Sequence, residues 1–143
     1  MSLFSSLSVS ASGMAAQRTR AALLVENIAN AETTRTQDGG PYRRKDAIFQ
    51  TAPVASDFAS ELDSQLQTGV MVSAISIDPR PPEKQYAPGH PDADADGYVS
   101  MPHMNPAEDM VDLTGANRSY QANVAAISSV KDMIQKTIDL LRA

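Results

Sequence analysis

The sequence predicts a mainly α-helical protein with a small β-rich insert, in which long N- and C-terminal helices pair as a coiled coil around a proline-rich middle. All nine prolines lie between Pro41 and Pro106, so the interiors of both flanks are free of the residue that breaks long helices. Both flanks carry apolar side chains at alternating steps of three and four, which is typical of helices that pack along one another. We therefore assign residues 1–32 and 106–143 to one coiled-coil core domain, and residues 33–105 to an extended arm and the β-rich insert.

The N-terminal helix is expected to run from about Leu3 to about Ala31. Gly13 lies in its interior, where glycine costs about 1 kcal/mol relative to alanine, so either close packing or a local bend is expected there. The repeating face of this helix is mostly apolar or alanine. It comprises Phe4, Leu7, Ala11, Met14, Arg18, Ala21, Val25 and Ile28.

A polar segment follows this helix and leads into the arm. Asn27 and Asn30 lie three residues apart, so they share a helical face, where they either bond neighbouring backbone or mark a frayed helix end. Residues 38–41 (Asp-Gly-Gly-Pro) indicate a turn. Residues 42–50 are expected to form a strand or an extended arm. Residues 52–67 fit either a short amphipathic helix or a linker.

The β-rich insert is predicted from short apolar segments between turns. Residues 70–77 alternate in hydrophobicity with one change of phase, which indicates a strand with a bulge. Residues 84–87 and 97–101 are candidates for two further short strands. An insert of two or three such strands is too small to be stable without the helices.

The C-terminal helix is predicted to begin at Pro106. Asn105 can cap its free amides, proline suits the first helical position, and Glu108 stands where a capping-box carboxylate reaches back. Seven of the nine residues on its repeating face are apolar, which predicts a continuous helix-packing seam. The face comprises Leu113, Asn117, Tyr120, Val124, Ile127, Lys131, Ile134, Ile138 and Leu141.

Composition excludes several classes of protein. The net charge of −5 argues against a nucleic-acid partner, and the acidic excess is concentrated in residues 51–109. The chain has no cysteine, so disulfides and thiolate metal sites are excluded. We expect no membrane span, because no run of apolar residues is long enough, and no cleaved signal peptide at the N-terminus.

One motif suggests metal binding, but it is incomplete. Asp92, Asp94, Asp96 and Gly97 match the opening of a calcium loop, whose twelfth position must be a glutamate and is His103 here. Aspartates that cap a local turn are the simpler interpretation. His90 and His103 are the only histidines and have no third ligand pattern. We expect no cofactor and no enzymatic activity, because no catalytic motif is present.

Ordered blocks of the sequence resemble the bacterial flagellar rod and hook proteins. The blocks begin with residues 27–34 (NIANAETT) and 39–45 (GGPYRRK) and continue through residues 78–82, 88–95 and 97–99. They end with residues 105–113 and with residues 117–124 (NRSYQANV). The signature residues that carry over are Asn27, Ala29, Asn30, Thr33, Thr34, Gly40, Pro41 and Tyr42.

The resemblance implies a structural subunit of the proximal rod of the flagellar basal body, in the periplasm, which polymerises through its terminal helices. It implies export by the flagellar type III apparatus without signal cleavage, with copies of the chain and other rod proteins as partners. A soluble calcium-binding helical module and a secreted coiled-coil component of a type III secretion system remain alternatives. The residues expected to form the assembly seam are Leu7, Met14, Val25, Ile28, Tyr120, Val124, Ile127, Ile134, Ile138 and Leu141.

Overall fold

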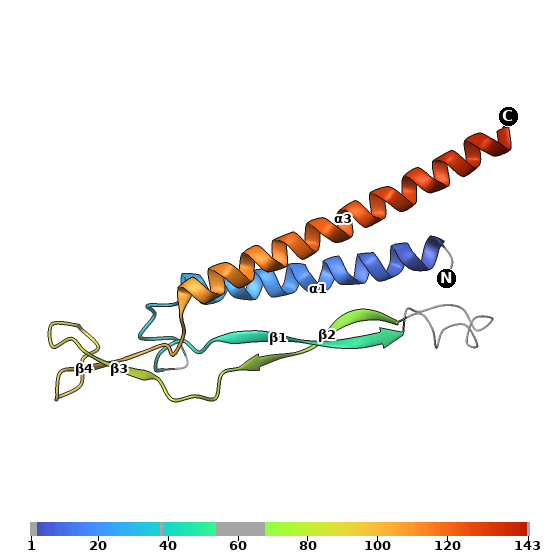
Figure 1. Cartoon of the computed structure of the whole chain (residues 1–143). Coiled ribbons are helices and arrows are strands. Elements are labelled where there is room, and N and C mark those ends of the chain that lie inside the picture. The colour runs from blue at the N-terminus through green and yellow to red at the C-terminus, as the bar shows by residue number, and fades with distance from the viewer. Residues whose placement is uncertain (1–2, 38, 54–67, 143) are drawn as a thin grey trace.

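A computed structural model describes residues 3–37, 39–53 and 68–142 of the chain. Two long helices enclose two β-hairpins in the sequence (Figure 1). The elements are α1 (Leu3–Ala29), β1 (Lys45–Pro53), β2 (Thr68–Ile77), β3 (Glu83–Tyr86), β4 (Tyr98–Met101) and α3 (Pro106–Arg142).

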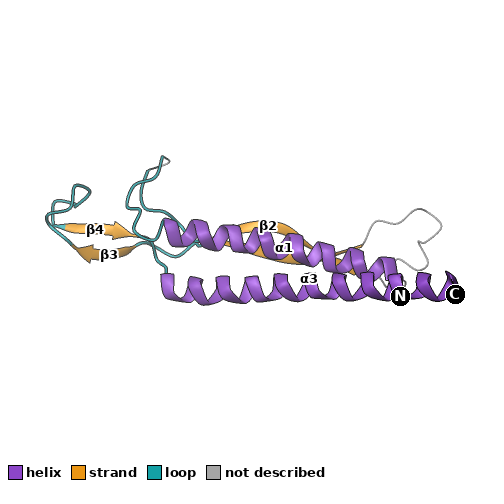
Figure 2. Ribbon diagram, turned by 90° about the horizontal axis from the view of Figure 1, so that it is seen from above, coloured by secondary structure: helices purple, strands orange, loops and turns teal. Residues whose placement is uncertain are grey.

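Helix α1 is the central element of the molecule. It contacts α3 on one side and the β1–β2 hairpin on the other, so that the hairpin and α3 form outer layers (Figure 1). The two ends of the chain lie at the same end of the helix pair, and the β3–β4 hairpin projects beyond the opposite end (Figures 1 and 2). Long helices at both termini with small antiparallel sheets between them are confirmed.

The ends of the helices follow from local chemistry. Helix α1 ends at Ala29, two residues before the predicted end, and α3 begins at Pro106 as predicted. Asn105 Oδ1 accepts a hydrogen bond from the amide of Ala107 at 3.1 Å, so the predicted N-cap is confirmed. The carboxylate of Glu108 reaches back to the side-chain amide of Asn105 at 3.3 Å, whereas a capping box would place it on the backbone N–H.

The two helices approach closely along part of their length. Both carry buried apolar side chains, which are Ala16, Leu23 and Leu24 on α1 and Ala116 and Val130 on α3. A Cβ atom built on Gly13 would lie 3.1 Å from Nδ2 of Asn123 on α3. Close packing, and not a bend, is therefore what Gly13 provides.

Strands β1 and β2 form an antiparallel pair from Lys45 opposite Ile77 to Pro53 opposite Thr68. The register shifts between Ile48 and Phe49, which leaves Ser73 of β2 as the extra residue, so the predicted bulge is confirmed one position from the change of phase. Ala52 and Pro53 belong to β1 and not to a helix. Residues 54–67, the rest of the predicted helix or linker, lie outside the described residues.

The second hairpin is short. Strands β3 and β4 pair antiparallel, with Tyr86 opposite Tyr98 and their rings in an edge-to-face contact at 5.4 Å between centroids. Gly97 precedes β4 with a φ of +81°, a left-handed conformation that favours glycine. The insert therefore consists of two separate two-stranded hairpins among the described residues, whereas one unit of two or three strands was predicted.

Candidate assembly site

Three segments that are distant in sequence meet at the base of the helix pair. They are the end of α1, the arm before β1 and the first turn of α3. We call their shared polar cluster the hub, which consists of Asn27, Tyr42, Arg44, Lys45 and Asp109. Two of its members are almost completely buried, because Asn27 is 0% and Asp109 1% exposed.

Asn27 joins α1 to the arm through its carboxamide. Its Nδ2 donates to the carbonyl oxygen of Lys45 at 2.9 Å, and its Oδ1 accepts from the amide of Lys45 at 3.0 Å. The side chain thus bonds one residue of β1 as an adjacent strand would. Sequence reasoning left open whether Asn27 bonds backbone or marks a frayed end, and the structure shows the first.

Tyr42 completes this part of the hub. Its hydroxyl donates to Oδ1 of Asn27 at 3.0 Å, and its ring is buried. Burial raises the pKa of Tyr42 from 10.0 to about 12, and the nearby carboxylate of Glu26 adds to the shift, because both disfavour the phenolate. The amide of Tyr42 also donates to the carbonyl of Thr33 at 3.0 Å.

Arg44 joins the arm to α3. Its Nε and Nη2 donate to Oδ1 of Asp109 at 3.0 and 2.7 Å, and its Nη1 donates to Asp46 at 2.9 Å. The hydrogen bonds to Asp109 raise the pKa of Arg44. Asp112, one turn further along α3, pairs with Arg20 of α1 at 3.4 Å. These ion pairs connect α1, the arm and α3 at one point.

Most signature residues lie in or beside the hub. Asn30 Nδ2 donates to the carbonyl of Glu26 at 2.9 Å, and the hydroxyl of Thr33 donates to Oδ1 of Asn30 at 3.2 Å. Gly40 has a φ of +85°, and its carbonyl accepts from the amide of Thr36 at 2.8 Å, which closes the arm's turn. Ala29 is exposed.

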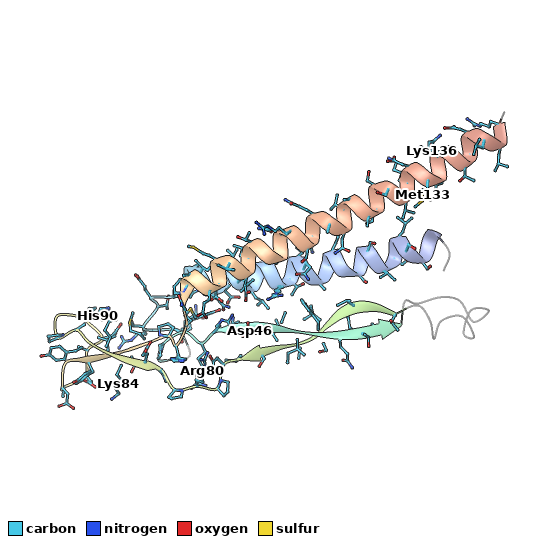
Figure 3. All side chains as sticks on the ribbon, in the orientation of Figure 1. Asp46, Arg80, Lys84, His90, Met133 and Lys136 are labelled. Carbon is cyan, nitrogen blue, oxygen red and sulfur yellow. The ribbon has the colours of Figure 1, made fainter. Side chains whose placement is uncertain are left out.

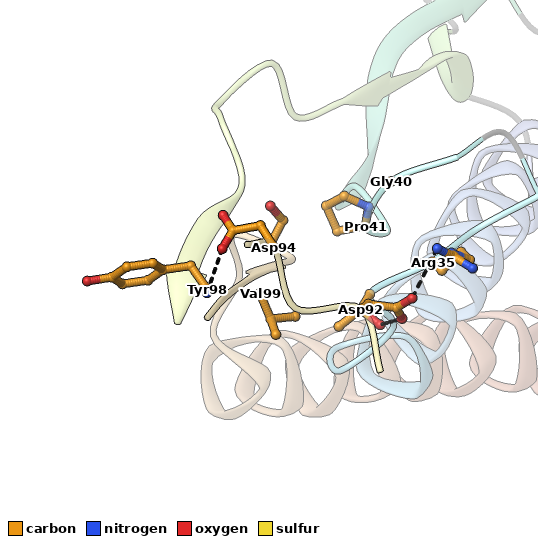
Figure 4. A pocket seen from close by; sticks show the side chains of 9 residues that line it. Arg35, Gly40, Pro41, Asp92, Asp94, Tyr98 and Val99 are labelled. Atoms are coloured by element: carbon orange, nitrogen blue, oxygen red, sulfur yellow. Dashed lines mark hydrogen bonds and ion pairs between the residues drawn. The ribbon is translucent and has the colours of Figure 1, made fainter. Parts of the chain in front are cut away.

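A pocket of about 250 Å³ separates the arm from the β3–β4 hairpin (Figure 4). Asp92 bridges its two walls, because one oxygen accepts from the hydroxyl of Thr34 at 2.8 Å and the other pairs with Arg35 at 3.2 Å. Gly40 and Pro41 line the pocket from the arm. The carboxylate therefore holds the second hairpin against the arm.

Asp94 caps the turn that leads into β4. Its Oδ1 accepts from the amide of Tyr98 at 2.8 Å (Figure 4) and from the amide of Asp96 at 3.1 Å. Asp92 faces the arm, so the three aspartates of the incomplete calcium loop do not converge. In residues 3–37, 39–53 and 68–142, no group of three or more His, Asp or Glu side chains could hold a metal ion.

One of the two histidines of the chain lies near the hub. His103 borders a pocket with Arg44, Arg80 and Asp109, whereas His90 lies on the distant β3–β4 loop (Figure 3). Arg80 donates hydrogen bonds to Asp78 and thereby lowers the pKa of that carboxyl to about 2.

Helices α1 and α3, as described, are not long and apolar enough to cross a membrane.

The predicted seam residues lie beside the contact between the helices. On α3 the contact passes through Ala116, Asn123 and Val130, and each of these positions precedes a residue of the predicted face. Tyr120 and Val124 are 40% and 45% exposed. Leu7, Met14, Ile28, Ile127 and Ile134 are half-buried, and Val25, Ile138 and Leu141 are exposed.

The distal part of α3 extends past the N-terminal end of α1 (Figures 1 and 2). It carries several exposed apolar side chains, with Leu140 and Leu141 78% and 83% exposed. Met133, 49% exposed, and Lys136 lie on this part of the helix (Figure 3). The distal part of α3 therefore carries exposed apolar side chains beyond the end of α1.

Sequence reasoning missed the roles of Arg44 and Asp109. In the sequence, Arg44 belongs only to the block of residues 39–45 and Asp109 only to the block of residues 105–113, and neither block predicts a contact between them. The two residues are 65 positions apart, and no periodicity relates them. The one available signal was a carboxylate at the interior-facing position of α3 one turn before Leu113.

Comparison with known proteins agrees with this architecture. Residues 95–140 match the family model described as the C-terminal region of flagellar basal body rod FlgEFG proteins. The chain is 40% identical to the flagellar basal-body rod protein FlgC of Borreliella burgdorferi, over 99% of both chains. It is 40% identical to FlgC of Bacillus subtilis over 98% of this chain and 99% of that one, and 38% identical to FlgC of Salmonella typhimurium over 98% of both. The chain therefore belongs to the FlgC family of flagellar basal-body rod proteins.

Proposed function

We propose that this protein is a structural subunit of the proximal rod of the flagellar basal body, which polymerises through its terminal helices into a torque-transmitting rod. The single observation that carries the proposal is its identity of about 40% to FlgC rod proteins over nearly the whole chain. Membership of a family of rod proteins gives the chain a structural role and not a catalytic one.

The surface of α3 supports assembly through the helices. Tyr120, Val124 and Ile138 lie on one flank of the contact with α1, and they are 40–45% exposed. In the proposed rod, this flank packs along helices of neighbouring subunits as a coiled coil, with apolar side chains repeating every three or four residues. Contacts between unlike surfaces of successive copies form an open helical array, which is the geometry of a tube.

Partners and location follow from the same family membership. We propose that the subunit contacts copies of itself and other rod proteins, and that it assembles in the periplasm after export through the flagellar type III apparatus without signal cleavage. A chain that passes unfolded through a narrow channel benefits from having no disulfides, and this chain has no cysteine.

Gene deletion tests this function. Cells that lack the gene are expected to be non-motile, and their isolated basal bodies are expected to keep the membrane ring but lack rod and hook in electron micrographs. The intact gene supplied on a plasmid should restore swimming, which is the control for effects on neighbouring genes. Swimming deletion cells with complete basal bodies would refute the proposal.

A further inference from the structure

We propose that the β1–β2 hairpins of neighbouring copies pair edge to edge. The half of β2 nearest the hub would bond the half of β1 nearest the hairpin end in the next copy. The inference rests on the proposed function, because it requires copies of the chain to lie side by side. A two-stranded sheet has two outer edges, and the described strands form such a sheet.

Side chains of α1 already bond one residue on each edge. On β1, Asn27 bonds both the amide and the carbonyl of Lys45. On β2, the amide of Val70 donates to the hydroxyl oxygen of Ser12 at 3.1 Å. Helix α1 therefore covers the edge of β1 near the hub and the edge of β2 near the hairpin end. The uncovered halves are the edge of β1 near the hairpin end and the edge of β2 near the hub, and they lie diagonally across the sheet from each other.

The alternation of the ladder shows which backbone groups face outward. The amide of Asp78 donates to the carbonyl of Arg44 at 2.9 Å, so the backbone N–H and C=O groups of this pair point toward the partner strand. In the adjacent pair, Lys45 with Ile77, the backbone groups therefore point away from the hairpin. By the same alternation, Ile75 faces outward from β2. On β1, Phe49 and Thr51 belong to outward pairs, with Val72 and Val70 as their partners in the hairpin.

The edge of β2 lacks the features that keep exposed strands apart. Its ten residues include neither a charged residue nor a proline, and Ile75 and Ile77 are 51% and 55% exposed. Proteins protect free edges with charges, prolines or coverage, and an unprotected apolar edge pairs with another strand. The charges of β1, on Lys45 and Asp46, lie at the end that Asn27 already covers.

The two open half-edges are complementary in direction. Neighbours that share one orientation place β2 of one copy antiparallel to β1 of the next, because the strands of each hairpin are antiparallel. Pairing the open halves sets Ile77 opposite Phe49, Ser76 opposite Gln50 and Ile75 opposite Thr51 of the neighbour. In the hairpin itself, Ile77 lies opposite Lys45, so the neighbour is displaced by four residues, or roughly 13 Å. Such a displacement builds a helical array and not a flat ring.

Engineered cysteines test this register, and the natural chain has none to interfere. Cells would produce one copy with Gln50→Cys and a second, tagged copy with Ser76→Cys, and basal bodies would be isolated under mild oxidation. Both residues are exposed, and directly opposite positions that are not hydrogen-bonded lie close enough for a disulfide. Each copy carries a single cysteine, so a disulfide within one chain is excluded. Gln85→Cys on β3 replaces Gln50→Cys in the matched control.

The proposal predicts a covalent heterodimer on non-reducing gels, with a peptide that joins position 50 to position 76, and at least a tenfold weaker band in the Gln85 control. Dimers joined between two copies of the same variant would show that like strands pair, and would overturn the proposal. So would the absence of any dimer when the variants are present in basal bodies of swimming cells. That last result leaves the proposed rod function intact, whereas swimming deletion cells with complete basal bodies would contradict the function itself.

Discussion

Arg44 of the arm bonds a single carboxylate oxygen of Asp109 twice, at 3.0 Å from Nε and 2.7 Å from Nη2. Asp109 is 1% exposed and Arg44 23%, so the pair is shielded from water on the carboxylate side. The contact links the segment before β1 to the first turn of α3. It therefore fixes where the C-terminal helix starts relative to the rest of the subunit.

Replacing Arg44 by methionine is expected to destabilise the folded monomer. The change leaves the Asp109 carboxylate buried without its cation, and breaking a buried pair costs about 3–5 kcal/mol, or about 2–4 kcal/mol with Arg44 partly exposed. Urea denaturation followed by circular dichroism measures the loss. Arg43→Met is the matched control, because Arg43 is the exposed neighbour of Arg44 in the arm, and it should change the midpoint little. Equal midpoints for the two variants would contradict the role of the buried pair.

Alkaline pH should destabilise the protein through Tyr42. Its pKa is raised to about 12 in the folded state, against 10.0 for an ordinary tyrosine. The unfolded state therefore releases this proton first, so the contribution to stability is complete below about pH 10 and falls as the pH rises from about 10 to about 12. Urea midpoints measured over that interval should fall less steeply for Tyr42→Phe. A Tyr42→Phe slope equal to that of the natural protein would be inconsistent with the assignment.

The two interior helix glycines are expected to respond differently to alanine. A Cβ at Gly115 meets nothing within 4 Å, so Gly115→Ala should stabilise the monomer by about 1 kcal/mol through helix propensity alone. A Cβ at Gly13 would lie 3.1 Å from Asn123, so Gly13→Ala should gain less or lose stability. Thermal unfolding of both variants decides the matter. A gain at Gly13 as large as that at Gly115 would show that the helices do not approach closely there.

An aspartate at Val124 should block rod assembly without unfolding the subunit. Val124 is 45% exposed, so the folded monomer tolerates the charge, whereas a packed interface between subunits would have to bury it. We expect the variant to have the circular dichroism spectrum of the unchanged protein. We also expect its cells to lose swimming and to contain basal bodies without a rod. Ala125→Asp adds the same charge at the adjacent exposed position, which points about 100° away around the helix, and should swim. If Val124→Asp cells swim, Val124 is not part of the assembly seam.

Much of the fold was predictable because its determinants are local. Proline positions and the cap at Asn105 bounded α3, and the change of phase in residues 70–77 marked the bulge of β2. The contact line between the helices was not predictable in the same way. The apolar face of α3 is wider than the surface that α1 covers, so periodicity alone cannot separate the residues that contact α1 from those left for neighbours.

The hub was the least predictable part of the candidate site. Asn27 was singled out by its spacing from Asn30, but its partner Lys45 lies 18 residues later and has no pattern that identifies it. Bonds of this kind depend on how the arm returns along α1. That path is set by the turn at Gly39 and Gly40, whose φ angles are +82° and +85°.

The pairing of the first helix with the last also determines when the subunit can fold. Contacts between α1 and α3 join residues about a hundred positions apart, as Gly13 and Asn123 show. A chain that emerges from one end must therefore be almost complete before either helix finds its partner. Loop closure over such a distance slows folding, and helices gain most of their stability from tertiary packing, so neither helix is firmly stable before the other arrives. The topology thus keeps the chain open until most of α3 is available to pack against α1.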